Sequence, residues 1–323
     1  MQTRTLGHSG LKPSTIGLGT WAMGGGDWKF GWGPQDDQAS IAAIHAAIDA
    51  GINWIDTAAI YGHGHSERVV GEAIKDRRQD VIIATKCGRV WEGDSREIGK
   101  SLRRESIFRE VEASLTRLQI EVIDLYQLHW PEPDEQIEEG WAAVAELIRA
   151  GKVRFGGVCN FNLAQLKRAQ SIHPITSLQP PYSMLKRDIE SEIMPWCAAN
   201  QVGIVAYSPM QAGLLTGRFT AARAAALPEN DWRKRSPFFQ EPQLSANLRV
   251  VERVTPIAAR LSITVSQLAL AWVLRLPAMT AAIAGARDPQ QIQETARGGE
   301  VALTPAVVDE IEVILKLRAR EPA

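Results

Sequence analysis

The feature that most constrains this chain is a regular alternation between short apolar runs and longer segments with helical periodicity. Segments such as DDQASIAAIHAAIDAG and EEGWAAVAELIRAG space their apolar residues as a helix does. Strands that alternate with helices predict parallel βαβ units. Runs such as VIIATK and VGIVAYS are apolar without alternation, as expected of strands buried on both faces. Eight runs are expected to be strands: 15–19, 52–56, 81–86, 122–129, 153–159, 176–179, 203–206 and 280–284.

Eight strands spread over the whole chain favour an α/β fold closed into a (β/α)8 TIM barrel. No linker divides the chain, so we expect residues 1–323 to form a single domain. The alternative, an open doubly wound sheet, usually carries G-x-G-x-x-G after its first strand. The stretch GLGTWAMGGGDWKFGWG never has that spacing. We further expect extra C-terminal helices in DPQQIQETARG and TPAVVDEIEVILKLRAR, and a long loop over 211–245 after strand seven.

Composition limits the classes of partner and the compartment. Lys+Arg 36 against Asp+Glu 37 gives a net charge of -1, so neither nucleic acid nor a membrane surface is an expected partner. Cys87, Cys159 and Cys197 lie far apart without C-x-x-C, which fits a reducing compartment better than a disulfide framework or a metal site. The chain begins without an apolar signal segment and has no run long enough to span a bilayer, so the cytoplasm is expected. Nothing in the sequence indicates an oligomeric state.

Three consecutive apolar runs end on ionisable residues, namely Asp56, Lys86 and His129. Tyr61 follows Asp56 on the loop that leaves the same strand. Alone, each residue has an ordinary structural explanation: a turn aspartate, a surface lysine, a core tyrosine or a structural histidine. In a barrel, however, the carboxyl ends of the strands meet at one mouth. We therefore expect a carboxylate, an ammonium, an imidazole and a phenol to converge there.

Carbonyl reduction needs this set of groups. Hydride addition produces an alkoxide, so a proton donor must lie within hydrogen-bond reach of the oxygen. A free tyrosine has a pKa of about 10, and a neighbouring ammonium lowers it. We expect Tyr61 to be the general acid and base, Lys86 to lower its pKa, and Asp56 to hold Lys86 charged and in place. His129 would orient the carbonyl and donate a hydrogen bond to the developing oxyanion.

At these residues the chain resembles the aldo-keto reductase superfamily over essentially its whole length. The resemblance is carried by GINWIDTAAIYGHGHSERVVGEAI, VIIATKCG, DLYQLHWPEP, GKVRFGGVCNFN and LQPPYSML. It implies that Asp56, Tyr61, Lys86 and His129 form the catalytic tetrad. The opening GWGPQDD and the His-Trp-Pro triplet are most similar to a bacterial branch that includes inositol-utilisation and general-stress reductases. The implied activity is interconversion of aldehydes or ketones, sugars among them, with alcohols by hydride transfer from or to NADP(H).

The resemblance also implies cofactor contacts along the chain. They fall beside the nicotinamide (Gly19, Thr20, Trp21 and Asp56), at its carboxamide (Asn160 and Gln179), along the pyrophosphate (Tyr207, Ser208, Pro209, Gly213, Leu214, Thr216 and Gly217), near the 2′-phosphate (Gly285 and Arg287) and near the adenosine (Gln291 and Glu294). Arg287 favours NADP over NAD because a guanidinium pairs well with a phosphate dianion; the alternative is a solvated arginine indifferent to the cofactor. Three residues depart from the family pattern: Cys159 stands where serine is usual, Met210 replaces a leucine, and Thr295 replaces an asparagine.

Tryptophans on the expected mouth loops predict an aromatic substrate pocket, suited to flat aldehydes or the apolar face of a sugar. They are Trp21, Trp28, Trp91, Trp130 and, in the long loop, Trp232. Packing is the alternative explanation for so many tryptophans. His63 and His65 lie beside Tyr61 but have no third ligand at metal-site spacing, so no metal is expected.

Two other functions remain open. One is a regulatory subunit of the same fold that senses the cofactor with little or no turnover, like the β subunits of potassium channels. The other is a metal-dependent barrel isomerase or lyase, which would need more strand-end ligands than Asp56 and His129.

Overall fold

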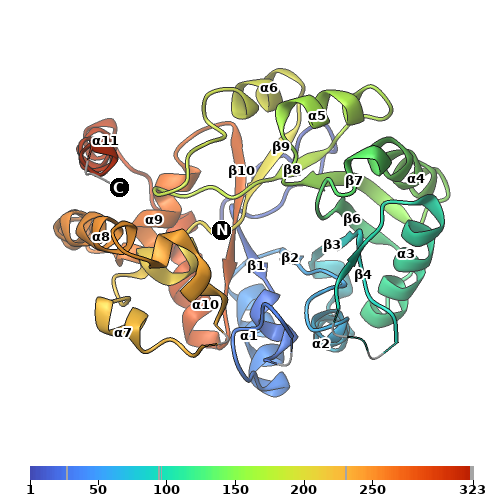
Figure 1. Cartoon of the computed structure of the whole chain (residues 1–323), viewed down its shortest axis with the longest axis horizontal. Helices are drawn as coiled ribbons and strands as arrows, with labels where there is room; N and C mark the ends of the chain where they lie inside the picture. The colour runs from blue at the N-terminus through green and yellow to red at the C-terminus, as the bar shows by residue number, and fades with distance from the viewer. Residues whose placement is uncertain (27, 94, 96, 230, 321–323) are drawn as a thin grey trace.

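A computed structural model describes residues 1–26, 28–93, 95, 97–229 and 231–320. It confirms the closed barrel: eight parallel strands follow one another in the order β1-β10-β9-β8-β7-β6-β3-β2, and β1 pairs with both β10 and β2. Figure 1 shows the helices arranged around these strands. The barrel strands are β1 (Ile16–Gly19), β2 (Trp54–Asp56), β3 (Ile82–Cys87), β6 (Ile123–Leu128), β7 (Val153–Cys159), β8 (Ser177–Gln179), β9 (Gly203–Ala206) and β10 (Met279–Gly285).

Every apolar run expected to be a strand contains or overlaps one barrel strand. The differences lie at the ends and have local causes. Asn53, for example, precedes β2, and its side chain accepts a hydrogen bond from Ser14 N (2.7 Å), which ties this position to the N-terminal segment. The sequence did not predict the antiparallel hairpin of β4 (Arg89–Val90) and β5 (Gly99–Lys100). Strands of two residues are too short to produce a periodic pattern.

The helices begin and end at residues with the expected local chemistry. Asp36 is the N-cap of the first helix, where its carboxylate accepts a hydrogen bond from Ala39 N (2.8 Å), and Gly151 follows the fourth helix with φ +76°. The helices are α1 (Asp37–Asp49), α2 (His65–Ile74), α3 (Arg104–Leu118), α4 (Ile137–Arg149), α5 (Leu163–Gln170), α6 (Ile193–Ala199), α7 (Ala221–Ala225), α8 (Gln243–Arg260), α9 (Val265–Leu274), α10 (Pro289–Ala296) and α11 (Pro305–Arg320).

The C-terminal part contains the expected additions. α10 and α11 are the two predicted helices, and α11 packs against α8 on the outside of the molecule (Figure 1). The described residues of the segment 211–245, which are 211–229 and 231–245, contain no strand, but they include α7 and the start of α8. Among the described residues, no single helix has the length and apolar character to cross a membrane; only the bent pair of α8 and α9 reaches that standard, when both are counted together.

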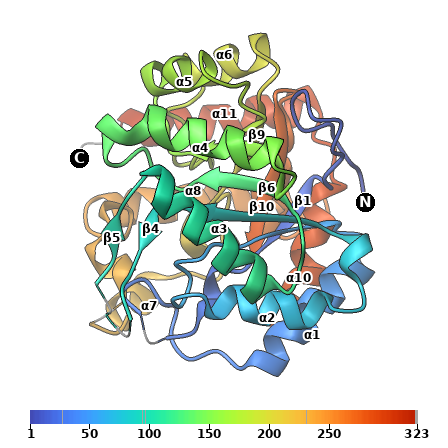
Figure 2. The same cartoon turned by 90° about the vertical axis from the view of Figure 1, so that its right-hand side faces the viewer.

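The core has two parts. The larger part lies between the strands and the surrounding helices. The smaller part fills the barrel interior, where Trp54, Leu125 and Ile283 pack with Leu6 and Leu11 of the N-terminal segment. Figure 2 shows the N terminus at one end of the molecule and the β4–β5 hairpin with α7 at the other. The N-terminal segment therefore closes the base of the barrel and leaves the opposite end, the mouth, open to ligands.

Candidate active site

Strand register brings the four predicted catalytic residues together at the mouth. Asp56 ends β2, and Lys86 lies near the end of β3. His129 follows β6, and Tyr61 lies in the turn between β2 and α2. The Lys86 ammonium lies 2.6 Å from Asp56 Oδ1 and 5.2 Å from the centre of the Tyr61 ring. The Tyr61 and His129 rings lie 5.9 Å apart between centres.

Lys86 and Asp56 form a buried ion pair, with only 1% and 3% of the residues exposed. Lys86 also donates to Thr57 O at 2.8 Å, and Gln179 Nε2 donates to Asp56 Oδ2 at 2.8 Å. Burial lowers the pKa of the Lys86 ammonium, but the Asp56 carboxylate raises it and prevails. Lys86 therefore stays charged at neutral pH, and its geometry is the one expected if Asp56 holds it.

The Tyr61 phenol departs from expectation. Burial raises its pKa to about 12, and the nearby charge of Lys86 is the largest effect in the opposite direction. Burial of the phenolate in a poorly hydrated wall raises the pKa more than the charge of one ammonium lowers it. Lys86 limits the rise in pKa rather than producing the net decrease that we expected. Tyr61 is consequently protonated at neutral pH, which is the form that donates a proton.

His129 presents a neutral imidazole. Burial lowers its pKa well below the ordinary value, and the charges of Lys86 and Arg89 lower it further. A neutral ring has one N–H donor and one acceptor. Asn160 Nδ2 donates to the His129 backbone oxygen at 3.0 Å and thereby fixes the chain that carries the ring.

Tyr61 is held by a close approach of two loops. Gly62, the next residue, has φ +60°, and a Cβ there would lie 2.1 Å from the backbone oxygen of Gly24 in the loop after β1. Only glycine fits this contact without displacing one of the loops. The β1 loop and the turn carrying Tyr61 are therefore packed as one unit.

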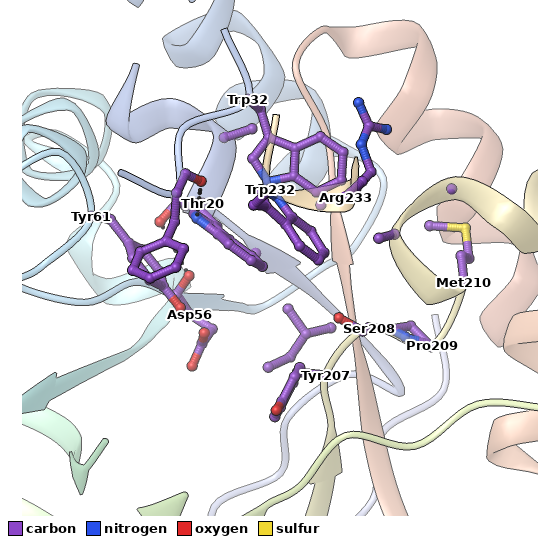
Figure 3. A pocket seen from close by; sticks show the side chains of 18 of the residues that line it. Thr20, Trp32, Asp56, Tyr61, Tyr207, Ser208, Pro209, Met210, Trp232 and Arg233 are labelled. Atoms are coloured by element: carbon purple, nitrogen blue, oxygen red, sulfur yellow. Dashed lines mark hydrogen bonds between the residues drawn. The ribbon is translucent and has the colours of Figure 1, made fainter. Parts of the chain in front are cut away.

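A cavity of about 1170 Å³ opens at the mouth. In Figure 3, Tyr61 and Asp56 lie on one side of it and Met210 on the other, with Trp232 between them. Most of the predicted cofactor residues line it, namely Gly19, Thr20, Trp21, Asp56, Asn160, Gln179, Tyr207, Ser208, Pro209, Gly213, Thr216, Gly285, Arg287, Gln291 and Glu294. Two do not: Leu214 is buried in the core, and a Cβ on Gly217 would contact Val265.

The amides expected to hold the carboxamide contact other site residues. Asn160 Oδ1 accepts a hydrogen bond from the Tyr207 hydroxyl at 2.9 Å, and Gln179 donates to Asp56. Tyr207 therefore lies next to Asn160 in the wall of the pocket, and its expected contact with the pyrophosphate stays a prediction. Each amide side chain still has a donor or acceptor position that these hydrogen bonds do not use.

The Arg287 guanidinium bonds only to neutral oxygens in the described residues. Nε donates to Gln35 Oε1 at 2.7 Å, Nη1 to Trp32 O at 3.5 Å, and Nη2 to Pro34 O. Its charge thus has no carboxylate partner among these contacts. Glu294, by contrast, is paired with Arg218 at 2.6 Å. One end of the pocket therefore contains a fixed positive charge.

The aromatic wall differs in part from the prediction. Trp21, Trp28, Trp130 and Trp232 line the pocket, but Trp91 does not. Trp91 packs instead on the ring of His63, 5.4 Å away between centres.

Sequence reasoning missed Trp32 and Phe30, which also line the pocket. Trp32 meets the ring of Trp232 edge-on at 5.9 Å, beside the guanidinium of Arg233 (Figure 3). The density of aromatic residues in the stretch after β1 was the available signal for these positions.

Sequence reasoning also missed a group of charged side chains in the same pocket. Arg89 and Lys100 reach it from the β4–β5 hairpin, and Glu132 reaches it from the loop after His129. Within the described ranges, no cluster of three or more His, Cys, Asp or Glu side chains could hold a metal ion. His65 instead contacts Asp37 through Nε2 at 2.8 Å.

The sequence model described as the aldo/keto reductase family matches residues 15–316. The aldo-keto reductase YhdN of Bacillus subtilis (strain 168) is 39% identical over 91% of this chain and 87% of its own length. An NADH-specific methylglyoxal reductase of Escherichia coli (strain K12) is 36% identical, covering 95% of this chain and 96% of that protein. A probable voltage-gated potassium channel subunit beta of Arabidopsis thaliana is 30% identical over 100% of this chain and 99% of its own.

Solved structures that are similar to this chain belong to proteins of the same kind. The glycerol dehydrogenase AKR11B4 from Gluconobacter oxydans superposes with a TM-score of 0.90 at 34% identity, covering 99% of this chain and 97% of that one. An aldo/keto reductase from Klebsiella pneumoniae in complex with NADP and acetate has a TM-score of 0.74 at 27% identity, covering 98% and 96%. Both are similar along nearly their entire length.

Proposed function

This chain belongs to the aldo/keto reductase family, and on that premise we propose that it is an NADP(H)-dependent oxidoreductase that interconverts carbonyls and alcohols. The observation that supports this most strongly is the buried Lys86–Asp56 pair beside Tyr61 in the wall of a large pocket. A structural tyrosine would not need a buried ammonium at its ring.

The described residues fit a dinucleotide. The volume of about 1170 Å³ exceeds the roughly 300–1,000 Å³ usual for small-ligand sites. Arg287, with neutral partners only, would bind the 2′-phosphate, while Asn160 would bind the carboxamide and Gly213 and Thr216 would lie along the pyrophosphate. When bound, the cofactor supplies or accepts the hydride. The relatives include both a complex with NADP and an NADH-specific enzyme, so our preference for NADP rests on Arg287.

Each site residue then has one role. Tyr61, protonated at neutral pH, donates its proton to the carbonyl oxygen as charge develops there. Lys86 stabilises the resulting phenolate, and Asp56 holds Lys86 in position. The neutral His129 ring donates a hydrogen bond that orients the carbonyl. For alcohol oxidation the same groups act in reverse.

The test is NADPH oxidation with 4-nitrobenzaldehyde. Tyr61→Phe should reduce kcat by about 100-fold to 10,000-fold, the usual contribution of a positioned general acid, while the dissociation constant for NADPH stays within about twofold. Tyr126→Phe is the matched control, because Tyr126 is fully buried outside the pocket; it should keep wild-type turnover. Comparable turnover in Tyr61→Phe and wild type would contradict the role of Tyr61.

A cofactor-sensing subunit is the second candidate, favoured by the 30% identity to a probable potassium channel subunit beta. It predicts tight NADPH binding without turnover of any aldehyde in wild-type protein. Measurable turnover that Tyr61→Phe abolishes would exclude a purely sensory role.

A further inference from the structure

A charged cluster lies in the wall of the same pocket, outside the catalytic residues. It consists of Arg89 in β4, Lys100 in β5 and Glu132, and we refer to it as the Arg89–Lys100 cluster. Arg89 Nη2 donates to Glu132 Oε2 at 2.8 Å, and Lys100 Nζ lies 2.8 Å from the same oxygen. All three residues line the cavity that contains Tyr61 and His129.

The cluster carries a net positive charge. Hydrogen bonds from Lys100 and Arg89 lower the pKa of Glu132, so at neutral pH one carboxylate faces two cations. Glu97 also lines this wall, but Arg89 and Lys100 both form their ion pairs with Glu132. One cation would be enough to pair with Glu132 and hold the hairpin. The second cation therefore has no carboxylate of its own within the cluster.

Arg89 is held in place, whereas Lys100 reaches solvent. The Arg89 side chain is 13% exposed and that of Lys100 is 53% exposed. The Arg89 guanidinium lies 5.5 Å from the ring centre of Trp130, the residue that follows His129. Arg89 is close enough to the reacting end of the site for its charge to contribute, after burial and Lys86, to the lowered pKa of His129. A fixed, partly desolvated guanidinium at this place is suited to binding a carboxylate or a phosphate.

We propose that the Arg89–Lys100 cluster binds an anionic substituent of the substrate, so that the enzyme prefers carbonyl compounds that carry a carboxylate or a phosphate. This inference rests on the proposed function. The aromatic wall of Trp21, Trp28 and Phe30 binds the uncharged part of the substrate, and the cluster binds the anion. The substituent takes no part in the bond changes and remains charged throughout.

The experiment compares pairs of substrates in which one member carries an anionic group and the other is neutral. The carboxylate pair is 4-carboxybenzaldehyde and its neutral methyl ester; the phosphate pair is glyceraldehyde 3-phosphate and glyceraldehyde. The readout is the ratio of kcat/KM for the anionic to the neutral member of each pair. In wild type the ratio should be about 10 or more at low salt, the gain from one charge-assisted hydrogen bond, and should fall in 0.5 M NaCl. Whichever pair shows the larger ratio identifies the anion.

Two variants should move the ratio in opposite directions. Arg89→Gln should lower it about tenfold, because the fixed cation is lost. Glu132→Gln should raise it, because both cations lose their competitor. Arg104→Gln is the matched control: Arg104 is an exposed arginine on α3 that pairs with Glu146 outside the pocket, and its ratio should equal that of wild type.

A wild-type ratio near one, or equal changes in both substrates of a pair in Arg89→Gln, would overturn the proposal. A second readout separates it from the proposed function. Quenching of tryptophan fluorescence gives the affinity for 4-(hydroxymethyl)benzoate and for benzyl alcohol without turnover. If wild type reduces none of the aldehydes, the proposed function fails. A loss of the difference in affinity between the two alcohols in Arg89→Gln would still support the anion site.

Discussion

Replacing Lys86 with methionine tests whether the catalytic lysine is also a structural residue. At the observed 2.6 Å, the gross attraction between Lys86 and Asp56 is about 6 kcal/mol for an effective dielectric constant of about 20. Removing one partner of a buried pair typically costs about 3–5 kcal/mol, because the other charge stays buried without compensation. Asp56 is 3% exposed and keeps its hydrogen bond from Gln179. We therefore expect Lys86→Met to lower the free energy of unfolding at pH 7 by about 3 kcal/mol.

The second substitution Asp56→Asn should recover at least half of that loss. An asparagine removes the stranded charge and keeps an oxygen that accepts the Gln179 hydrogen bond.

The assay is denaturant unfolding followed by fluorescence and circular dichroism, with the slope compared between variants. Lys152→Met is the control: this exposed lysine pairs with Glu112 at the surface, and its loss should change stability by less than about 1 kcal/mol. Turnover should be absent from both Lys86→Met and the double variant, because neither has the ammonium. A single variant as stable as wild type, or a double variant no more stable than the single, would refute the reasoning.

Two further predictions concern cofactor choice and pH. Arg287→Ala should weaken NADPH about tenfold more than NADH in competitive titrations, since only NADPH has the phosphate for a guanidinium; equal weakening would remove the basis for NADP preference. Burial raises the pKa of Glu110 from its ordinary 4.5 to about 7, so the folded protein binds an extra proton between these values, and wild-type stability should fall from pH 4.5 to 7 by up to about 3 kcal/mol. Glu110→Gln, which cannot ionise, should flatten this dependence in unfolding experiments at pH 5 and 8, and an unchanged slope would locate the titration elsewhere.

The strands and their ends could be predicted because their signals are local. A buried parallel strand is an unbroken apolar run, and the residues at its carboxyl end lie at the mouth of a barrel, so Asp56, Lys86 and His129 could be placed there from the apolar runs and the fold class. Helix ends also have local causes, as the N-cap Asp36 and the positive φ of Gly151 show.

What could not be predicted depends on contacts between segments far apart in the chain. The net direction of the Tyr61 pKa is a balance between burial and one charge, and burial has no sequence signal. Trp91 was assigned to the pocket by its position on a mouth loop, yet a histidine beside Tyr61 provides its packing partner. The Arg89–Lys100 cluster required the hairpin, whose strands are too short to leave a pattern.

The N-terminal segment separates the part of the barrel that closes its base from the part that forms the pocket. Arg4 donates to the backbone oxygens of Leu274, Leu276 and Met279 at the base, where Leu6 and Leu11 cover the barrel interior. None of these three N-terminal residues, Arg4, Leu6 and Leu11, lines the pocket. Loops at the mouth can therefore be varied for a new substrate without changing the residues that close the base, so an engineer seeking altered specificity should keep the N-terminal segment unchanged and randomise the mouth loops.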